Sequence, residues 1–373
     1  MLQNKIYQNF LLEIFKTFLI ILFGLTLVAL TVRAVSFLDL IVENGYPINT
    51  YFQFSLLNFF GIMPKFIPLS FLIALTIFII KHMQDSEFII LWTSGEKKIY
   101  IVNLFFISSI VVLLFYLLFS TFLTPLALNK SRQLLSNENL NSLLPTIRKQ
   151  QFSDSFKGFT FIVEQKLDNE IQNIFLHDKG NNLKNLSSNS SKINTTTIIA
   201  KNGIIDFNRM LLFNGQIITS KNDFNNEIIK FEQLNIDLSS LSTTTIKSPK
   251  IQETSTLLLL SCFLTKKNKK KFCNEGFKKE ILPTLSRRII IPFYLPVLSL
   301  MCALLLIKSK KIYLNKILIF TYSFIVLLFT ELAVRYTGIN NAIMMSFIII
   351  PFALLGILYL FLNLAFINEI KKI

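Results

Sequence analysis

Residues that commonly carry catalysis are scarce in this chain of 373 residues. It has two histidines, His82 and His177, and no HExxH, GxSxG or GxxxxGKS/T motif. These motifs supply a zinc site, a serine nucleophile and a cradle for ATP phosphates, respectively. We therefore expect no catalytic residue, no metal and no cofactor on this chain. His82 reads most simply as a polar residue at the end of a helix.

Two arginines at the edges of apolar segments are candidates for binding an anion. Arg33 and Arg335 each follow a long apolar segment. A guanidinium group matches phosphate geometry, so both are candidate ligands for the phosphorylated headgroup of an amphiphile. The simpler alternatives are that Arg33 reaches the membrane headgroups from a helix end, and that Glu331 pairs with Arg335 one turn later.

Ion-coupled transport is poorly supported by the sequence. Such transport usually leaves acidic residues within the membrane segments. The candidates are few, namely Glu13, Asp39 and Glu331.

Residues 85–95, DSEFIILWTSG, read as an amphipathic helix of about ten residues between two apolar segments. Asp85 or Ser86 is placed to cap its start, and Ser94-Gly95 is placed to end it. Phe88, Leu91 and Trp92 share one face. Two interpretations are open: a connector at the membrane surface, anchored by Trp92, or a docking element whose apolar face enters a groove of a partner while Glu87 pairs with a partner's arginine.

The composition is that of a membrane protein. The chain is 52% hydrophobic with a mean hydropathy of +0.54. The net charge of +16 invites a nucleic-acid interpretation, but no zinc finger or helix-turn-helix accompanies it. The lysines lie at the ends of apolar segments and in the cluster KKNKKK, Lys266–Lys271, to which we assign no role. We expect no nucleic-acid partner.

The three cysteines, Cys262, Cys273 and Cys302, form no CxxC pair and have no histidine at ligand spacing. Cys262 and Cys273 lie in one polar region and could pair if that region is exported. The interpretation that we favour is two free thiols, because proximity in sequence does not establish bonding geometry.

Six apolar segments are each long enough to cross a bilayer as a helix. Pro64 and Pro68 in the second and Pro292 and Pro296 in the fourth predict a kink or a broken helix start. The first segment is too long for a signal peptide, so we expect it to be a retained helix. The six segments are residues 14–38, 53–80, 99–127, 289–308, 316–335 and 342–366.

The distribution of lysines predicts the orientation. Residues 81–98 and 308–316 and the C-terminus carry lysines, whereas loops 39–52 and 336–341 contain no Lys or Arg. By the positive-inside rule both termini are cytoplasmic and the central region, residues 128–285, is outside. The two histidines then lie on opposite sides of the membrane.

The central region reads as an all-β domain with a helical end. Short segments rich in β-branched and aromatic residues predict strands, including FTFIV, IQNIFL, TTTIIA and IIKFEQLNIDL. Asn202-Gly203 and Asn214-Gly215 predict tight hairpin turns. Residues 181–194 read as a loop, and residues 253–264 and 272–288 as helices. The expected domains are residues 1–127 (three membrane helices), 128–285 (β domain) and 286–373 (three membrane helices).

This arrangement resembles the LptF/LptG permease family of the bacterial lipopolysaccharide export system, and is closer to LptF than to LptG. LLEIFKTFLIIL is similar to the family's first span, and QDSEFIILWTSGEKK to its cytoplasmic coupling helix. QFSDSFKGFTFIVEQ followed by IQNIFLHDK resembles the start of its periplasmic β-jellyroll, and EILPTLSRRIIIPFYLPVLSL its entry into the fourth span.

The resemblance implies a fold, partners and site residues. The fold is six transmembrane helices with an inserted periplasmic jellyroll-like domain, in the bacterial inner membrane. The partners are an LptG-like permease, an LptB-like ATPase dimer that binds ATP and Mg²⁺, an LptC-like jellyroll protein, and lipopolysaccharide. Glu87 matches the acidic residue that contacts the ATPase, and Arg33 matches a basic residue that faces lipid A phosphates. Ser36 stands where the family can carry a second basic residue.

The resemblance also implies a mechanism. Two such permeases enclose a cavity that lipopolysaccharide enters sideways between spans, including the first and the fifth. Closure of the ATPase on ATP moves the coupling helices, collapses the cavity and drives the lipid into the jellyroll. Two alternatives stay open: a non-transporting envelope protein that uses its β domain to bind partners, and a permease of another ATP-driven lipid or lipoprotein system, which usually has four spans.

Overall fold

A computed structural model describes residues 5–42, 47–139, 149–156, 158–167, 169–179, 193–206, 209–221, 226–237, 250–264, 275–307, 312–338 and 341–370. The chain divides into two units. The helical unit comprises Met1–Val32, Leu57–Asn129 and Lys250–Ile373, and the β unit comprises Arg33–Leu56 and Lys130–Pro249. Residues 250–285, which the sequence boundaries grouped with the β domain, belong to the helical unit by their contacts.

The prediction of six membrane helices is confirmed. These segments are rich in Leu, Ile and Phe, and inside a lipid phase a helix satisfies all their backbone hydrogen bonds internally. The spans are Lys5–Phe37, Ile48–Gln84, Lys98–Leu135, Glu280–Leu306, Lys316–Tyr336 and Ala342–Glu369. The main helices are α1 (Lys5–Phe37), α2 (Asp39–Val42), α3 (Ile48–Gln84), α4 (Glu87–Thr93), α5 (Lys98–Leu118), α6 (Thr124–Asn139), α8 (Thr256–Leu264), α9 (Glu275–Leu285), α10 (Tyr294–Ala303), α11 (Ile312–Tyr336) and α12 (Asn341–Ile370).

Two spans depart from α-helical geometry, and their irregular turns contact each other. The third contains a π-helical turn, η1 (Phe119–Leu123), between α5 and α6. The fourth contains the π turn η4 (Ser286–Ile290) and the 3₁₀ turn η5 (Ile291–Phe293), so the irregularity expected around Pro292 is present. By contrast, α3 continues through Pro64 and Pro68 as one helix. Further 3₁₀ turns are η3 (Ile251–Glu253) and η6 (Leu304–Leu306).

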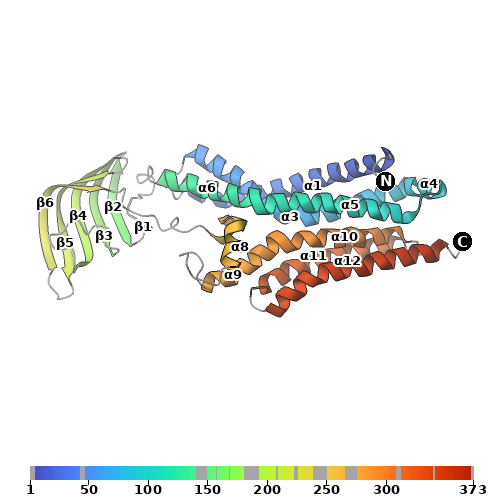
Figure 1. The fold of residues 1–373 in the computed structure, drawn as a ribbon. Helices are drawn as coiled ribbons and strands as arrows, with labels where there is room; N and C mark the ends of the chain where they lie inside the picture. Colours follow the sequence, from blue (N-terminus) through green and yellow to red (C-terminus); the bar gives the residue numbers. More distant parts are fainter. Residues whose placement is uncertain are drawn as a thin grey trace. The chain divides into compact units, whose positions relative to one another are not determined.

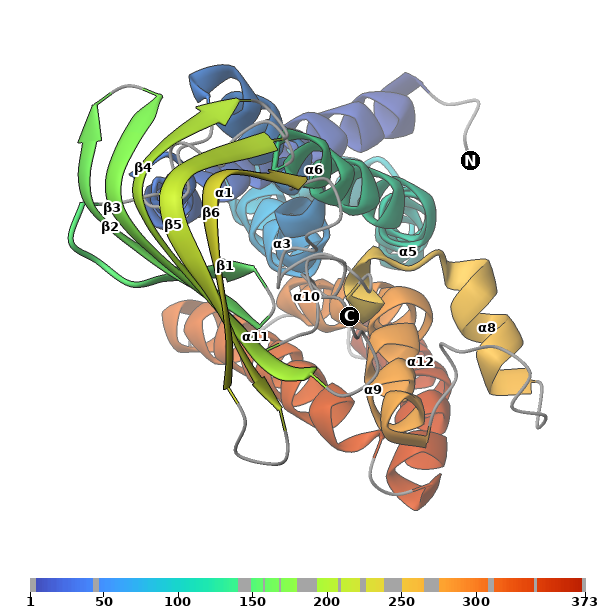
Figure 2. The same cartoon turned by 90° about the vertical axis from the view of Figure 1, so that its left-hand side faces the viewer.

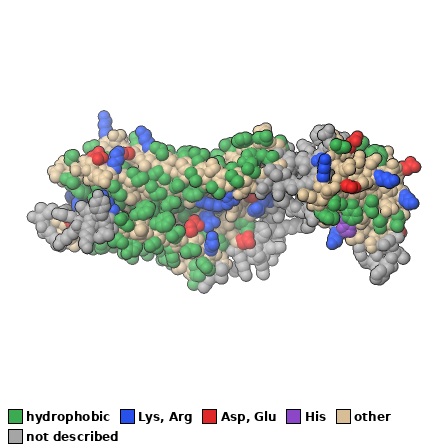
Figure 3. All heavy atoms as spheres, turned by 180° about the vertical axis from the view of Figure 1, so that it is seen from behind, with side chains coloured by type: hydrophobic (Ala, Val, Ile, Leu, Met, Phe, Trp, Pro, Cys, Tyr) green, Lys and Arg blue, Asp and Glu red, His purple; other side chains and the backbone are tan. Residues whose placement is uncertain are grey.

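The core of the helical unit is built around α3, α5 and α10. In the most apolar stretch of each span, 67% of the residues are buried in α3 and 72% in the fourth span, but only 17% in α1, α11 and α12. The last three helices therefore present apolar side chains outward, such as Ile20, Phe329 and Leu360. Figure 3 shows a mainly apolar face over the helices, with Lys and Arg side chains near their ends. Such a surface fits a lipid environment or a second membrane subunit.

The β unit contains one antiparallel sheet of six strands in the order of the sequence, which is strongly curved in Figure 2. Buried side chains form a row across it, because Phe161 pairs with Leu176, Leu176 with Ile198 and Ile198 with Ile217. The expected all-β domain is thus confirmed, with its described strands arranged as a meander. They are β1 (Ser153–Phe156), β2 (Phe159–Leu167), β3 (Glu170–Asp178), β4 (Ile193–Asp206), β5 (Arg209–Lys221) and β6 (Asn226–Asp237).

The prediction of hairpin turns at Asn202-Gly203 and Asn214-Gly215 is wrong. Both dipeptides lie inside strands, where Gly203 pairs with Leu212 and Gly215 pairs with Phe231. A Cβ on Gly203 would lie 2.7 Å from Ile174 Cδ1, and one on Gly215 would lie 2.4 Å from the backbone oxygen of Ile199. These glycines allow close approach of neighbouring strands, and Asn214 has φ 52°, which interrupts the extended geometry of β5.

The remaining sequence predictions have mixed outcomes. The helices expected around residues 253–264 and 272–288 are present as α8 and α9. Cys262 is disulfide-bonded, so the free-thiol interpretation that we favoured is wrong for this residue. Cys302 is a free, buried thiol. Cys273, the Lys266–Lys271 cluster and most of the loop at 181–194 lie outside the described residues.

Candidate functional site

The helix α4 lies at the end of the helical unit that also holds the start of α1 and the end of α12 (Figure 1). It is seven residues long, shorter than predicted. Asp85 continues the last turn of α3, because its N–H donates to the Lys81 carbonyl at 2.9 Å. Ser86 occupies the N-cap position with φ 59°, and its side chain makes no capping hydrogen bond. The predicted side-chain cap is therefore absent.

The C-terminal end of α4 follows the prediction. Gly95 has φ +95°, its N–H donates to Trp92 O at 3.2 Å, and the N–H of Glu96 donates to Leu91 O at 3.1 Å. This pair of hydrogen bonds is a Schellman motif, which requires a left-handed residue and so favours glycine. Gly95 therefore fixes where α4 ends and where the chain turns toward α5.

The apolar face that was a candidate for docking on a partner packs inward. Phe88 is fully buried in the core of the helical unit, and Leu91 and Trp92 pack against that core. Trp92 stacks on Phe88 with a centroid distance of 6.1 Å. The outward apolar surface of α4 consists instead of Ile89 and Ile90, which are 52% and 64% exposed. These two are the most exposed apolar side chains that α4 offers to a partner.

A charged cluster lies at the start of α4, and sequence reasoning missed it. His82 of α3 is 2% exposed, and its Nε2 lies 3.3 Å from Glu87 Oε2 and 3.4 Å from Glu13 Oε2. Its Nδ1 lies 3.0 Å from the Phe78 carbonyl. Lys81 Nζ donates to Glu13 Oε1 at 2.7 Å. The histidine thus joins α1, α3 and α4, and is more than a polar residue at a helix end.

The other end of α4 is also connected to distant helices. Tyr7 of α1 donates its hydroxyl to Glu96 Oε2 at 3.1 Å. Lys98 pairs with Glu369 near the end of α12, and its Nζ lies 4.6 Å from the Trp92 ring centroid. A displacement of α4 therefore acts on contacts with both the first and the last span.

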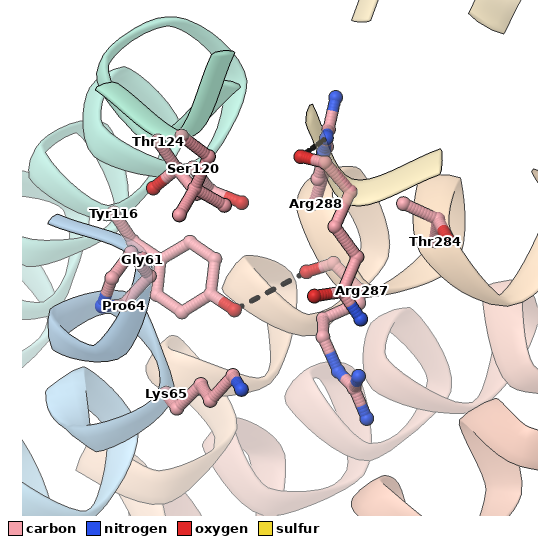
Figure 4. Close-up of a pocket in the computed structure, with 11 residues that line it drawn as sticks. Gly61, Pro64, Lys65, Tyr116, Ser120, Thr124, Thr284, Arg287 and Arg288 are labelled. Atoms are coloured by element: carbon pink, nitrogen blue, oxygen red, sulfur yellow. Dashed lines mark hydrogen bonds between the residues drawn. The ribbon is translucent and has the colours of Figure 1, made fainter. Parts of the chain in front are cut away.

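A second feature is a small cavity of about 60 Å³ between the second span and the irregular turns of the third and fourth spans. Three cations line it: Lys65 near Pro64 of α3, and Arg287 and Arg288 of η4. Hydroxyl groups face it from the third span, contributed by Tyr116, Ser120 and Thr124. Figure 4 shows the Lys65 amine, the Tyr116 hydroxyl and the Arg287 side chain together on one side, while Arg288 extends away.

The cations of this cavity differ in availability. Arg288 is held by three hydrogen bonds, because it donates to the carbonyls of Thr254 and Gln252 and to Thr256 Oγ1, at 2.8 to 3.0 Å. It is a structural link between η4 and the η3–α8 segment. Arg287 Nη2 donates to Glu331 Oε2 at 2.7 Å, while its buried Nε has no partner among the described residues. Arg287 therefore keeps one donor group, its Nε–H, for an anion in the cavity.

The π turn η4 explains the position of Arg287. Its carbonyl accepts a hydrogen bond from the Tyr116 hydroxyl at 3.2 Å, and the η1 carbonyl of Thr121 accepts one from Thr256 Oγ1 at 2.8 Å. π turns insert a residue into a helix and are frequent at functional sites. The sequence signal for this cavity was the Arg287-Arg288 pair before an apolar segment, and its other lining residues are distant in the sequence.

The two predicted headgroup ligands are exposed in their respective units. Arg33 lies near the end of α1 and belongs to the β unit, and Arg335 lies in the last turn of α11 in the helical unit. Neither has an ion pair among the described residues. The predicted pairing of Glu331 with Arg335 is wrong, because Glu331 binds Arg287 across two spans. Arg335 is thereby left without its nearest carboxylate.

Comparison with known proteins identifies a related family. The family model described as Lipopolysaccharide export system permease LptF/LptG matches residues 10–364. A comparison with curated proteins gives no match. The matched range begins within the first membrane helix and ends within the last, and it includes the four spans between them and the sheet.

Proposed function

Because the chain belongs to the LptF/LptG family and is a multi-pass inner-membrane protein, we propose that it is the permease subunit of an ATP-driven lipopolysaccharide exporter. It extracts the lipid from the outer leaflet of the inner membrane and passes it to a periplasmic β-jellyroll bridge. Both termini and α4 are cytoplasmic, and the sheet is periplasmic. The observation that carries this proposal is the family match over 10–364.

The chain obtains its energy from a separate subunit. It has no phosphate-binding loop of its own, so ATP and Mg²⁺ bind an LptB-like ATPase dimer and this chain is not an enzyme. The contact is α4, whose exposed Ile89 and Ile90 enter an apolar groove of the ATPase. Glu87, half exposed beside them, meets a basic residue of the partner. The inward Phe88 fixes α4 to the spans, so that a movement of the ATPase reaches the membrane.

The lipid is held by cations and apolar side chains. Arg33 and Arg335 contact its phosphorylated headgroup, and Arg287 at the small cavity offers a further contact for an anionic group. The acyl chains lie on the outward apolar faces of α1 and α11, opposite an LptG-like permease. The sheet then receives the acyl chains and transfers them to an LptC-like jellyroll protein, which extends it by pairing at a strand edge.

The first test is co-purification of the ATPase from cells that express this chain with LptG-like, LptB-like and LptC-like partners. Ile90→Asp places a charge on the proposed docking surface, and we expect it to abolish recovery of the ATPase. It is a cleaner probe than Glu87→Lys, which we also expect to lose the ATPase, because a lysine at 87 would repel His82 within the chain. Leu167→Asp is the matched control, since Leu167 is 62% exposed in the β unit.

The outcomes are distinct. Loss of the ATPase in Ile90→Asp, with normal recovery in Leu167→Asp, supports docking through α4. Failure of the wild-type chain to recover an ATPase contradicts the transport proposal and favours a non-transporting envelope protein. Mass spectrometry of the purified complex then tests whether the bound lipid is lipopolysaccharide.

A further inference from the structure

The surroundings of His82 place oxygen acceptors on both sides of its ring. A carbonyl oxygen can only accept a hydrogen bond, so Nδ1, at 3.0 Å from Phe78 O, carries a proton. Nε2 lies between carboxylate oxygens of Glu13 and Glu87 at 3.4 and 3.3 Å. An unprotonated Nε2 would direct its lone pair at two negative groups. Both sides of the ring therefore present oxygen acceptors, which suit a ring that donates from both nitrogens.

Charge balance gives the same result. The groups that face His82 from the packed helices are Glu13 of α1 and Glu87 of α4, and Lys81 of α3 pairs with Glu13. Asp85 also acts electrostatically on Lys81, so the three carboxylates outnumber the one ammonium, which suits a cationic ring. The ring itself is enclosed by Phe10, Phe78 and Phe88, with centroid distances of 4.9, 4.0 and 5.6 Å. These ring faces also suit a cation.

The cluster joins helices that are separate in the chain. The start of α4 follows α3 directly, but α1 reaches α4 only through side chains. Among the described residues, these contacts include His82 with its two carboxylates at the start of α4, the Phe10–Phe88 ring contact, and Tyr7 with Glu96 just after its end. α1 is thereby attached to both ends of α4, and the charged attachment at the start depends on one imidazole.

We propose that His82, as an imidazolium, is a positioning residue that locks Glu87 of α4 to Glu13 of α1, so that a displacement of α4 by the ATPase is transmitted to the first membrane span. The proposal rests on the proposed function, because it takes α4 as the ATPase contact. It adds a residue that touches neither ATP nor lipid and that sets how much transport each ATP produces.

The test uses the whole complex in lipid, with lipopolysaccharide release per ATP hydrolysed as the readout. His82→Gln removes the charge, and we expect normal ATPase recovery but a several-fold lower ratio. His82→Lys keeps the charge, and we expect it to restore part of the ratio.

Glu13→Gln supplies an independent variant, since Glu13 is partly exposed and its loss leaves the aromatic contacts in place. If both act through one cluster, the double variant His82→Gln/Glu13→Gln loses no more transport per ATP than the worse single variant. Spin labels at Lys16 of α1 and Thr93 of α4 provide a second readout. Their separation should stay constant through the ATP cycle in the wild type and broaden in His82→Gln.

The failures can be told apart. A wild-type chain that recovers no ATPase removes the proposed function itself. A complex that assembles normally, yet shows an unchanged transport ratio and unchanged label separation in His82→Gln, overturns the role of His82 alone. Additive losses in the double variant also overturn it, because they indicate two unrelated structural defects.

Discussion

Arg287 of η4 binds Glu331 of α11 at 2.7 Å, although Glu331 has Arg335 one turn away on its own helix. The ion pair joins the fourth and fifth spans at the rim of the cationic cavity. A carboxylate in that position competes with any anionic ligand for Arg287. Removing Arg287 should therefore weaken the binding of an anionic ligand, and removing Glu331 should strengthen it.

We predict that Arg287→Gln lowers the lipopolysaccharide retained by the purified complex by about tenfold, equivalent to about 1.4 kcal/mol. Glu331→Gln should raise retention, because the guanidinium is released for the ligand. Mass spectrometry of lipid bound per complex measures both. Equal losses in the two variants would show that the pair acts only as a structural link between the spans.

Gly95 provides a test of the α4 boundary. At φ +95° a side chain is strained, and Gly95→Ala should cost about 1–2 kcal/mol locally. We expect faster amide hydrogen exchange in Leu91–Glu96 and lower recovery of the ATPase in this variant. Gly24→Ala is the matched control, since a Cβ there also meets nothing within 4 Å but its backbone φ is not positive. Similar exchange rates in both variants would contradict the role of Gly95 in fixing the end of α4.

The membrane helices were predictable because the signal is a long run of apolar residues, which needs no tertiary information. The end of α4 was predictable for a similar reason, since Ser94-Gly95 determines it locally. The face of α4 was not, because the same stripe of Phe88, Leu91 and Trp92 serves an internal core as well as a partner. Only the contacts with α1 and α3 decide between them.

The sites that sequence reasoning missed are built from residues far apart in the chain. His82, Glu13 and Glu87 come from three helices, and no spacing rule connects them. Lys65, Tyr116 and Arg287 come from three spans and line one cavity beside the irregular turns of the third and fourth spans. The Asn-Gly dipeptides failed for a related reason, because a local turn signal was overridden by close packing of strands.

The two strand glycines should therefore differ in their tolerance of alanine. At Gly203 the new Cβ would meet the ends of side chains, Ile174 Cδ1 at 2.7 Å and Leu212 Cδ2 at 2.9 Å, which can move. At Gly215 it would meet backbone, Ile199 O at 2.4 Å. We expect Gly215→Ala to destabilise the β unit by about 1–3 kcal/mol, and Gly203→Ala by less. Limited proteolysis of the full chain during heating measures the order, and the reverse order would contradict the packing argument.

The exposed guanidinium of Arg33 leads to the last prediction. It has no ion pair among the described residues, so its charge is available to a ligand. We predict that Arg33→Glu reduces crosslinking of lipopolysaccharide to a photoreactive residue at position 36 by about tenfold while the complex assembles normally. Lys130→Glu, another exposed cation of the β unit, controls for the change in net charge. Unchanged crosslinking in Arg33→Glu would indicate that Arg33 contacts only membrane headgroups, which its position at a helix end also allows.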